Sequence, residues 1–227
     1  MRSDDKIRIA YLASYLHASL LRRVLTAHDP DRVSVYLYTD APLVAADWGV
    51  TVTPLSGTDL AQSFAANRID VAIDTVAPHA FEGQDRVVSA LGRRLAPVQI
   101  AWLGTWGTGG GLYDALLTDA DAVPPGAEAR YDEEILRIPG GQWAWEPPPE
   151  ALSPAPGPLP ASQNGAITFA ATVRGLRLSP RTFCRLGTDF SGVPGSRLAL
   201  VGFQAEDSPQ QRAFAEALRL PGLILRA

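Results

Sequence analysis

Residues 96–118 read APVQIAWLGTWGTGGGLYDALLT and contain an apolar run, a turn with five glycines and a second apolar run. Short apolar runs bounded by glycine or proline are typical of strands that are buried on both faces of a sheet. The stretch therefore predicts strands over residues 97–103 and 113–118. Ligands of open parallel sheets bind beyond the carboxyl ends of the strands, which is where these glycines lie.

Short apolar segments continue toward the N-terminus and alternate with amphipathic ones. Strands are expected over residues 6–12, 32–38, 50–54 and 70–75, and helices over residues 14–27, 58–67 and 84–95. Ser56 or Thr58 is expected to cap the second of these helices. Strands that alternate with helices are the pattern of parallel βαβ units. We therefore expect an α/β fold with a Rossmann-like, doubly wound parallel sheet over residues 1–146.

The composition changes after residue 146. Residues 147–164 read PPPEALSPAPGPLPASQN, and such proline-rich sequence favours extended backbone, so a linker is expected over residues 147–165. Beyond it, strands are expected over residues 166–172, 197–202 and 222–226, and helices over residues 179–190 and 209–218. This βαβαβ unit, residues 166–227, is expected to be a partial second Rossmann-like domain.

Composition limits the class of protein. The chain has 227 residues, a net charge of −4 and 46% hydrophobic residues, which is ordinary for a globular protein. No long basic run indicates a nucleic-acid partner, and no run of about 18 apolar residues predicts a membrane span. The single cysteine, Cys184, cannot form an internal disulfide, and the start of the chain has no export signal. These observations predict a cytoplasmic protein without nucleic-acid or membrane partners.

The glycine-rich stretch resembles a family signature of the form A-P-[IV]-Q-x-x-W-L-G-x-x-G-T-[ST]-G, followed by x-x-[DY]-[DY]-x-[IL]-x-[TA]-D. A P-P pair and the pattern Y-[ST]-E-x-[IL]-x-x-[IL]-P come next in that family, the O-linked N-acetylglucosamine (O-GlcNAc) transferases and SPINDLY-like proteins. Gly109 and Asp132 depart from the signature. The matching residues are Ala96, Pro97, Val98, Gln99, Trp102, Leu103, Gly104, Gly107, Thr108, Gly110, Tyr113, Asp114, Leu116, Thr118, Asp119, Pro124, Pro125, Tyr131, Glu133, Ile135, Ile138 and Pro139.

Shorter stretches resemble the same family, namely residues 7–11, 28–36, 69–74 and 193–200. The resemblance implies a GT-B-like fold, in which two facing Rossmann-like domains hold a nucleotide-sugar donor in the cleft between them. The family's donor-gripping G-H-T-T run belongs beyond residue 227. We therefore expect the N-terminal catalytic half plus the start of the second domain, a truncated form that is incomplete or degenerate as a stand-alone enzyme.

The resemblance also implies a set of donor-binding residues in the glycine-rich turn. Leu103 and Gly104 are expected against the sugar, with Gly107, Thr108 and Gly109 in the same loop. Glycines at such a position let the backbone approach a ligand and present N–H groups to it. The alternative is a glycine-rich turn that binds nothing.

Three further side chains, His17, His28 and Asp74, have either a functional or a structural role. By resemblance His17 lies near the reacting centre, where a histidine can shuttle protons at neutral pH; the alternative is a histidine on a helix surface. His28 is expected to be structural. Asp74 ends a predicted strand and either orients a ligand or caps the next segment, the second being the simpler interpretation.

Two arginines of the second domain are candidates for contact with the donor diphosphate. Arg177 occupies the position at which the family has a lysine on the diphosphate, and Arg174 is a second candidate cation. A cation there stabilises the negative charge of the leaving group. The alternative for both is a solvated arginine. No residue spacing indicates a metal site, and no cofactor is expected, since the uridine diphosphate N-acetylglucosamine (UDP-GlcNAc) donor would be a substrate.

The sequence leaves open whether the chain is an enzyme. The leading hypothesis is a glycosyltransferase-family protein related to UDP-GlcNAc-dependent protein O-GlcNAc transferases, a hexosyltransferase that uses Ser or Thr of a protein or peptide as acceptor. The alternative is a non-catalytic relative or accessory subunit that acts through protein binding. Either form could be completed by another polypeptide or could self-associate through the open edge of the second sheet. An unrelated dinucleotide-binding protein ranks last, because no G-x-G-x-x-G follows the first strand.

Overall fold

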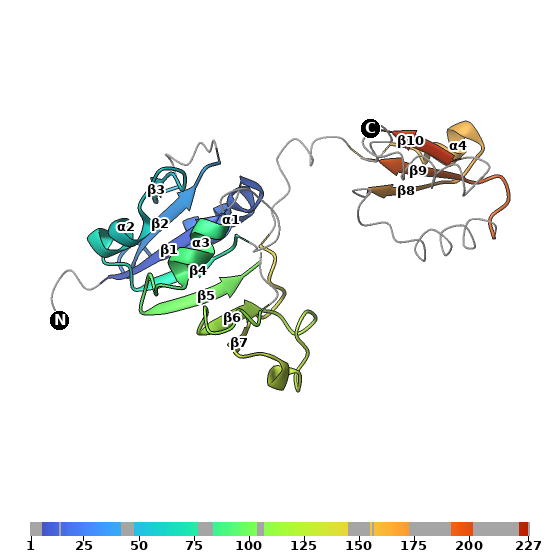
Figure 1. Cartoon of the computed structure of the whole chain (residues 1–227). Coiled ribbons are helices and arrows are strands. Elements are labelled where there is room, and N and C mark those ends of the chain that lie inside the picture. Colours follow the sequence, from blue (N-terminus) through green and yellow to red (C-terminus); the bar gives the residue numbers. More distant parts are fainter. Residues whose placement is uncertain are drawn as a thin grey trace. The chain divides into compact units, whose positions relative to one another are not determined.

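A computed structural model describes residues 6–13, 15–41, 48–76, 84–103, 107–144, 155, 157–172, 192–201 and 223–226. The chain divides into two compact units, Met1–Pro148 and Pro149–Ala227. Figure 1 shows the elements of both units along the chain. None of the helices in these ranges is long and apolar enough to cross a membrane.

The first unit contains a seven-stranded sheet in which every neighbouring pair of strands is parallel. The strand order is β3-β2-β1-β4-β5-β6-β7, so the direction of winding reverses between β1 and β4, as in doubly wound sheets. The elements are β1 (Ile7–Ala13), α1 (Tyr15–Ala27), β2 (Val33–Thr39), β3 (Thr51–Thr53), α2 (Leu60–Asn67), β4 (Val71–Asp74), α3 (Gln84–Leu91), β5 (Val98–Trp102), β6 (Ala115–Thr118), the 3₁₀ helix η1 (Glu128–Arg130) and β7 (Glu134–Arg137). This architecture confirms the predicted α/β fold class.

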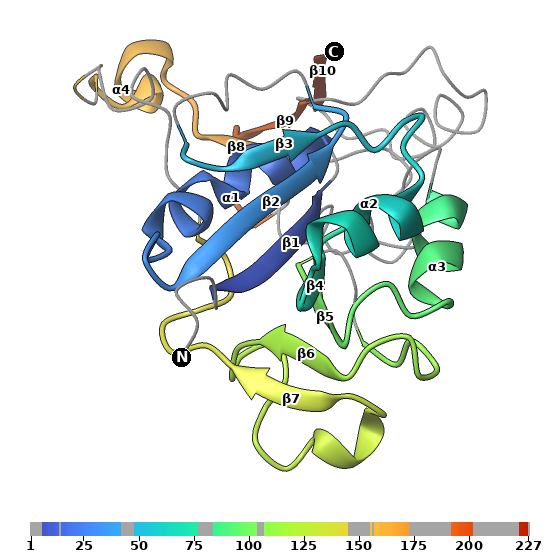
Figure 2. The same ribbon diagram turned by 90° about the vertical axis from the view of Figure 1, so that its left-hand side faces the viewer.

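Helices cover both faces of this sheet, as Figure 2 shows. Leu60 and Phe64 of α2 and Leu91 of α3 pack with one set of alternating strand residues. Leu21 and Leu25 of α1 pack with the other set on the opposite face. Successive side chains of a strand point to opposite faces, so a strand between two helix layers must be apolar throughout. That is why the predicted strands are continuous apolar runs.

The cap of α2 differs from the prediction. Asp59 caps this helix, because its carboxylate accepts a hydrogen bond from the Gln62 amide at 3.0 Å. The hydroxyl groups of the two predicted caps have other partners: Thr58 donates to the Pro54 carbonyl at 2.6 Å and Ser56 donates to the Asp40 carboxylate at 2.7 Å. Ser56 and Thr58 therefore do not cap α2, because their hydroxyl groups bond to partners outside the helix.

Two other boundaries differ for local reasons. Helix α3 ends at Leu91 rather than residue 95, since Gly92 follows and Arg94 adopts a left-handed conformation with φ of 61°. Strand β7 was not predicted as a strand. It is a half-buried edge strand of four residues with only two apolar side chains, so it has no continuous apolar run.

The second unit contains three parallel strands in the order β10-β9-β8. They are β8 (Thr168–Thr172), β9 (Arg197–Val201) and β10 (Leu223–Arg226), close to the predicted ranges. The short helix α4 (Pro160–Asn164) lies within the stretch that was predicted to be a linker; it begins with a proline and ends at Gly165 in the left-handed region. The predicted helices at 179–190 and 209–218 lie outside the described residues.

Candidate functional site

The loop after β5 leaves the carboxyl end of that strand at Leu103 and returns to the amino end of β6. Leu103 and Thr108 have left-handed backbone, with φ of 57° and 56°, although neither is a glycine. Such conformations cost about 1–3 kcal/mol each and persist only where surrounding contacts hold them. They are concentrated at binding sites, which makes this loop the candidate site.

A buried carboxylate holds the loop in shape. Glu133, whose side chain is 5% exposed, accepts hydrogen bonds from the Thr108 amide at 2.7 Å and the Gly109 amide at 2.6 Å. Charge-assisted bonds of this kind are about twice as strong as neutral ones. Both N–H groups therefore have an acceptor within the chain.

Two glycines of the loop are required by neighbouring aromatic rings. A Cβ atom at Gly107 would lie 2.7 Å from Cδ1 of Tyr131, and one at Gly109 would lie 2.7 Å from Cδ2 of Tyr113. Any side chain at either position would therefore displace a ring. These glycines allow the loop to pack against its own chain, a requirement that exists with or without a ligand.

A second buried carboxylate lies beneath the same loop, at the end of β4. Asp74 is 1% exposed and accepts hydrogen bonds from the Tyr113 hydroxyl at 2.6 Å and the Val76 amide at 2.8 Å. Burial raises the pKa of Asp74 to about 6, although both hydrogen bonds act to lower it. Burial likewise raises the pKa of Tyr113. The bond to Val76 is the local capping contact that the sequence indicated, and the bond to Tyr113 was not foreseen.

Gln99 joins the neighbouring elements to the loop. Its buried side-chain amide donates to the carbonyl oxygens of Leu91 at 3.1 Å and Leu112 at 2.6 Å, and its Oε1 accepts from the Leu95 amide at 2.8 Å. Leu91 ends α3 and Leu112 ends the glycine-rich loop. The signature glutamine is therefore a structural connection between the two.

The described site residues of the first unit lie in the loop after β5 and at the start of α1. Leu103, Gly107, Thr108 and Gly109 share the loop after β5. His17 lies in the first turn of α1, directly after β1. Because β1, β4 and β5 are neighbouring parallel strands, the start of α1 and Leu103 lie at the same carboxyl edge. Nothing is described for the His17 side chain, and Gly104, Arg174 and Arg177 lie outside the described residues.

His28 lies elsewhere. Its Nε2 is hydrogen-bonded to the Tyr11 hydroxyl at 2.8 Å beneath α1, and burial lowers its pKa. The contact agrees with the structural role expected for it. Within the ranges that the structure describes, no three His, Cys, Asp or Glu side chains gather as metal ligands.

Sequence reasoning recognised Tyr131 and Glu133 as signature residues without finding what they do. Both follow η1 and lie just before β7, about 25 residues after the loop that they contact. Their role depends on the pairing of β6 with β7, which brings the start of β7 beside the loop.

Comparison with solved structures defines the class of protein. The chain superposes on an O-GlcNAc transferase mutant from Thermobaculum terrenum with a TM-score of 0.80 and 24% sequence identity, over 99% of this chain and 45% of that one. No family model matches the chain. The fold is therefore the α/β, Rossmann-like fold of GT-B glycosyltransferases.

Curated relatives narrow the class to a family. The chain is 37% identical over 106 residues to the probable UDP-N-acetylglucosamine–peptide N-acetylglucosaminyltransferase SPINDLY of Solanum lycopersicum. The matched region covers 46% of this chain and 11% of the relative. It is 28% identical over 142 residues to the SPINDLY protein of Arabidopsis thaliana, covering 62% of this chain and 15% of the relative. These matches support the predicted resemblance to the SPINDLY and O-GlcNAc transferase family, and the chain spans about a tenth to a seventh of these relatives. These relatives do not favour the alternative of a non-catalytic binding protein.

Proposed function

We propose that this chain is part of a glycosyltransferase that transfers N-acetylglucosamine from UDP-GlcNAc to a hydroxyl group of a peptide. The observation that carries the proposal is the similarity to SPINDLY proteins, whose names give this donor and this acceptor class. The glycine-rich loop that begins at the carboxyl end of β5 supports it, because ligands of parallel sheets bind beyond the carboxyl ends of the strands.

The proposed reaction is a displacement at the sugar carbon. The Ser or Thr hydroxyl oxygen of the acceptor forms a bond to C1 of the sugar, and the bond from C1 to the diphosphate oxygen breaks. UDP leaves with the electron pair, and the hydroxyl proton goes to His17 as general base. The position of His17 at the start of α1 supports this role, and the ordinary pKa of histidine suits proton transfer near neutral pH.

Arg177 and Arg174 are proposed to bind the diphosphate. A guanidinium makes bidentate, charge-assisted hydrogen bonds to phosphate oxygens and keeps its charge at any working pH. Its attraction grows as negative charge develops on the leaving group, which lowers the barrier. The correspondence of Arg177 with the lysine position of the family supports this role.

Leu103 and the loop through Gly109 are proposed to lie against the sugar. Since Glu133 occupies the amides of Thr108 and Gly109, the sugar would contact other atoms of the loop, such as carbonyl oxygens and the Thr108 hydroxyl. A loop that is held in shape before binding has little conformational entropy to lose.

Three further statements stay predictions: a cytoplasmic location, completion by a second polypeptide, and self-association. Cell fractionation tests the first. Sedimentation of the purified chain alone tests self-association. Sedimentation with candidate partner proteins that contain a G-H-T-T run tests completion by a second polypeptide.

Calorimetry of the full chain with UDP-GlcNAc, combined with mass spectrometry of a Ser/Thr peptide after incubation, tests the proposed function. Saturable binding and a mass increase of one N-acetylhexosamine are expected. His17→Ala should abolish transfer and preserve binding, whereas Arg177→Met should weaken binding. Arg32→Gln, a change at an exposed turn, serves as the control for a lost positive charge. Absence of both heat and transfer would contradict the proposal.

A further inference from the structure

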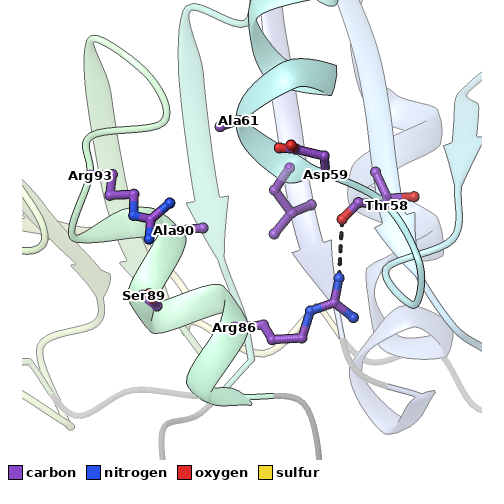
Figure 3. A pocket seen from close by; sticks show the side chains of 8 residues that line it. Thr58, Asp59, Ala61, Arg86, Ser89, Ala90 and Arg93 are labelled. Atoms are coloured by element: carbon purple, nitrogen blue, oxygen red, sulfur yellow. Dashed lines mark hydrogen bonds between the residues drawn. The ribbon is translucent and has the colours of Figure 1, made fainter.

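A hollow of about 400 Å³ lies between the loop that precedes α2 and the outer side of α3. We name it the α2–α3 hollow; the residues that give it its character are Asp59, Ala61, Arg86, Ser89, Ala90 and Arg93. Figure 3 shows these side chains around the opening. None of them belongs to the loop after β5 or to the other predicted donor-binding residues.

Two arginines make one side of the hollow positive. Arg86 lies in the first turn of α3 and Arg93 in the turn that follows the helix, seven residues later, so both are on the same side of it. One guanidinium nitrogen of Arg86 donates to the Thr58 carbonyl at 3.1 Å, as Figure 3 shows, which fixes that side chain across the hollow. A guanidinium has five N–H donors, so Arg86 can donate to a ligand as well as to Thr58.

The start of α2 forms the opposite side. Its first-turn residues Leu60 and Ala61 line the hollow, and the amide groups at the start of a helix carry a partial positive charge. Asp59, the N-cap, contributes one negative charge and accepts from the Gln62 amide. Two arginines and one aspartate leave the hollow with a net charge of +1 in a chain whose net charge is −4.

The space between these groups is lined by small side chains. Ala61 lines the hollow from α2, and Ser89 and Ala90 line it from α3. Its volume falls within the range of about 300–1,000 Å³ that is usual for small-molecule sites. A phosphate group alone would leave much of that space unfilled.

We propose that the α2–α3 hollow binds a phosphate monoester. A tetrahedral oxyanion has three oxygens that can accept at once from two guanidinium groups and a hydroxyl, whereas a carboxylate can be paired fully by a single arginine. The organic part of the ester lies over Ala61 and Ala90. The site is separate from the proposed sugar transfer, so its test needs no transferase activity.

The test is calorimetric titration of the full chain with phenyl phosphate, inorganic phosphate and acetate at constant ionic strength and pH 7.5, where the phosphate group is mostly dianionic. Phenyl phosphate should bind saturably and more tightly than inorganic phosphate, and acetate should bind least. Arg93→Gln and Arg86→Gln should each weaken phenyl phosphate binding about tenfold. Arg32→Gln, which removes one charge from an exposed turn, should leave it unchanged.

Asp59→Asn removes a negative charge from the hollow, so its effect on binding should be opposite to that of the arginine variants. Asparagine caps a helix as well as aspartate does, so α2 is preserved while the negative charge is removed, and binding should tighten about threefold. Thermal unfolding of each variant checks that the fold is intact. Arg93→Gln is the safer variant, because Arg86 also bonds to Thr58.

Three results would overturn the proposal. The first is no saturable binding of phenyl phosphate. The second is equal weakening by Arg93→Gln and Arg32→Gln, which would indicate a general charge effect. The third is binding of inorganic phosphate without binding of phenyl phosphate, which would exclude an ester as the ligand.

Discussion

At the scale of single residues, the shape of the candidate site depends on two buried carboxylates with different partners. Glu133 accepts from two loop amides, and Asp74 accepts from a tyrosine hydroxyl beneath the same loop. Each is largely removed from water, so each must be compensated by hydrogen bonds. Substitutions that keep the shape and change only the charge or the acceptor therefore test them separately.

We predict that Glu133→Gln lowers the free energy of unfolding by about 1–3 kcal/mol. A glutamine keeps one acceptor oxygen and turns a donor NH₂ group toward the second amide, which is then unsatisfied. Urea denaturation measures the change. The exposed neighbour Glu134 provides the matched control, and Glu134→Gln should change stability by less than about 0.5 kcal/mol. Equal effects of the two substitutions would refute the role given to Glu133.

The pH dependence of stability should change in Asp74→Asn. The pKa of Asp74 is about 6 in the folded state against 3.8 ordinarily, so the folded state holds an extra proton between those values. Its contribution is fully present below pH 4 and is lost as the pH rises through 6, by ~3 kcal/mol in all. Relative to the original chain, Asp74→Asn should therefore gain stability as the pH rises from 4 to 7.

Urea denaturation of both proteins at several pH values measures this difference. Comparing the two cancels the contributions of other acids such as Asp114 and Asp119, whose pKa values are lowered. A constant difference from pH 4 to 7 would show that Asp74 keeps an ordinary pKa in the folded state.

At the scale of elements, Gln99 connects the end of α3, strand β5 and the end of the glycine-rich loop. We predict that Gln99→Leu lowers the free energy of unfolding by about 3 kcal/mol or more, because it leaves buried backbone groups of Leu91, Leu95 and Leu112 without partners. Gln62→Leu, at an exposed position of α2, is the matched control and should change stability little. Amide hydrogen exchange should also quicken at the end of α3 in the first variant and not in the second.

The elements themselves were predictable because periodicity and burial agree. Every strand and helix expected in the first unit is present within a few residues, since apolar runs such as residues 9–13 are buried between two helix layers. β7 was missed because its burial comes from its neighbour β6 rather than from an apolar run.

The candidate site was only partly predictable. The position of the glycine-rich loop follows from strand order alone, whereas the partners of its amides do not. Glu133 and Tyr131 are more than 20 residues away from the loop in the sequence. The pairing of β6 with β7 brings them beside it. No local pattern encodes such a contact.

At the scale of the whole molecule, the first unit has its own sheet and helices on both faces of it. We predict that residues 1–148 fold without the rest of the chain, because two apolar clusters are completed within this segment. A single cooperative thermal transition and dispersed amide proton resonances of the isolated segment would support this. A spectrum typical of an unfolded chain would show that the segment depends on residues 149–227.

The two hydrogen bonds from the loop after β5 to Glu133 affect how fast a ligand can bind there. Because both amides have their acceptor before any molecule arrives, binding requires no rearrangement of the backbone at residues 108 and 109. In rapid-mixing experiments the observed rate of association at this edge is then expected to rise in proportion to concentration, without levelling off at the speed of a loop that must first close.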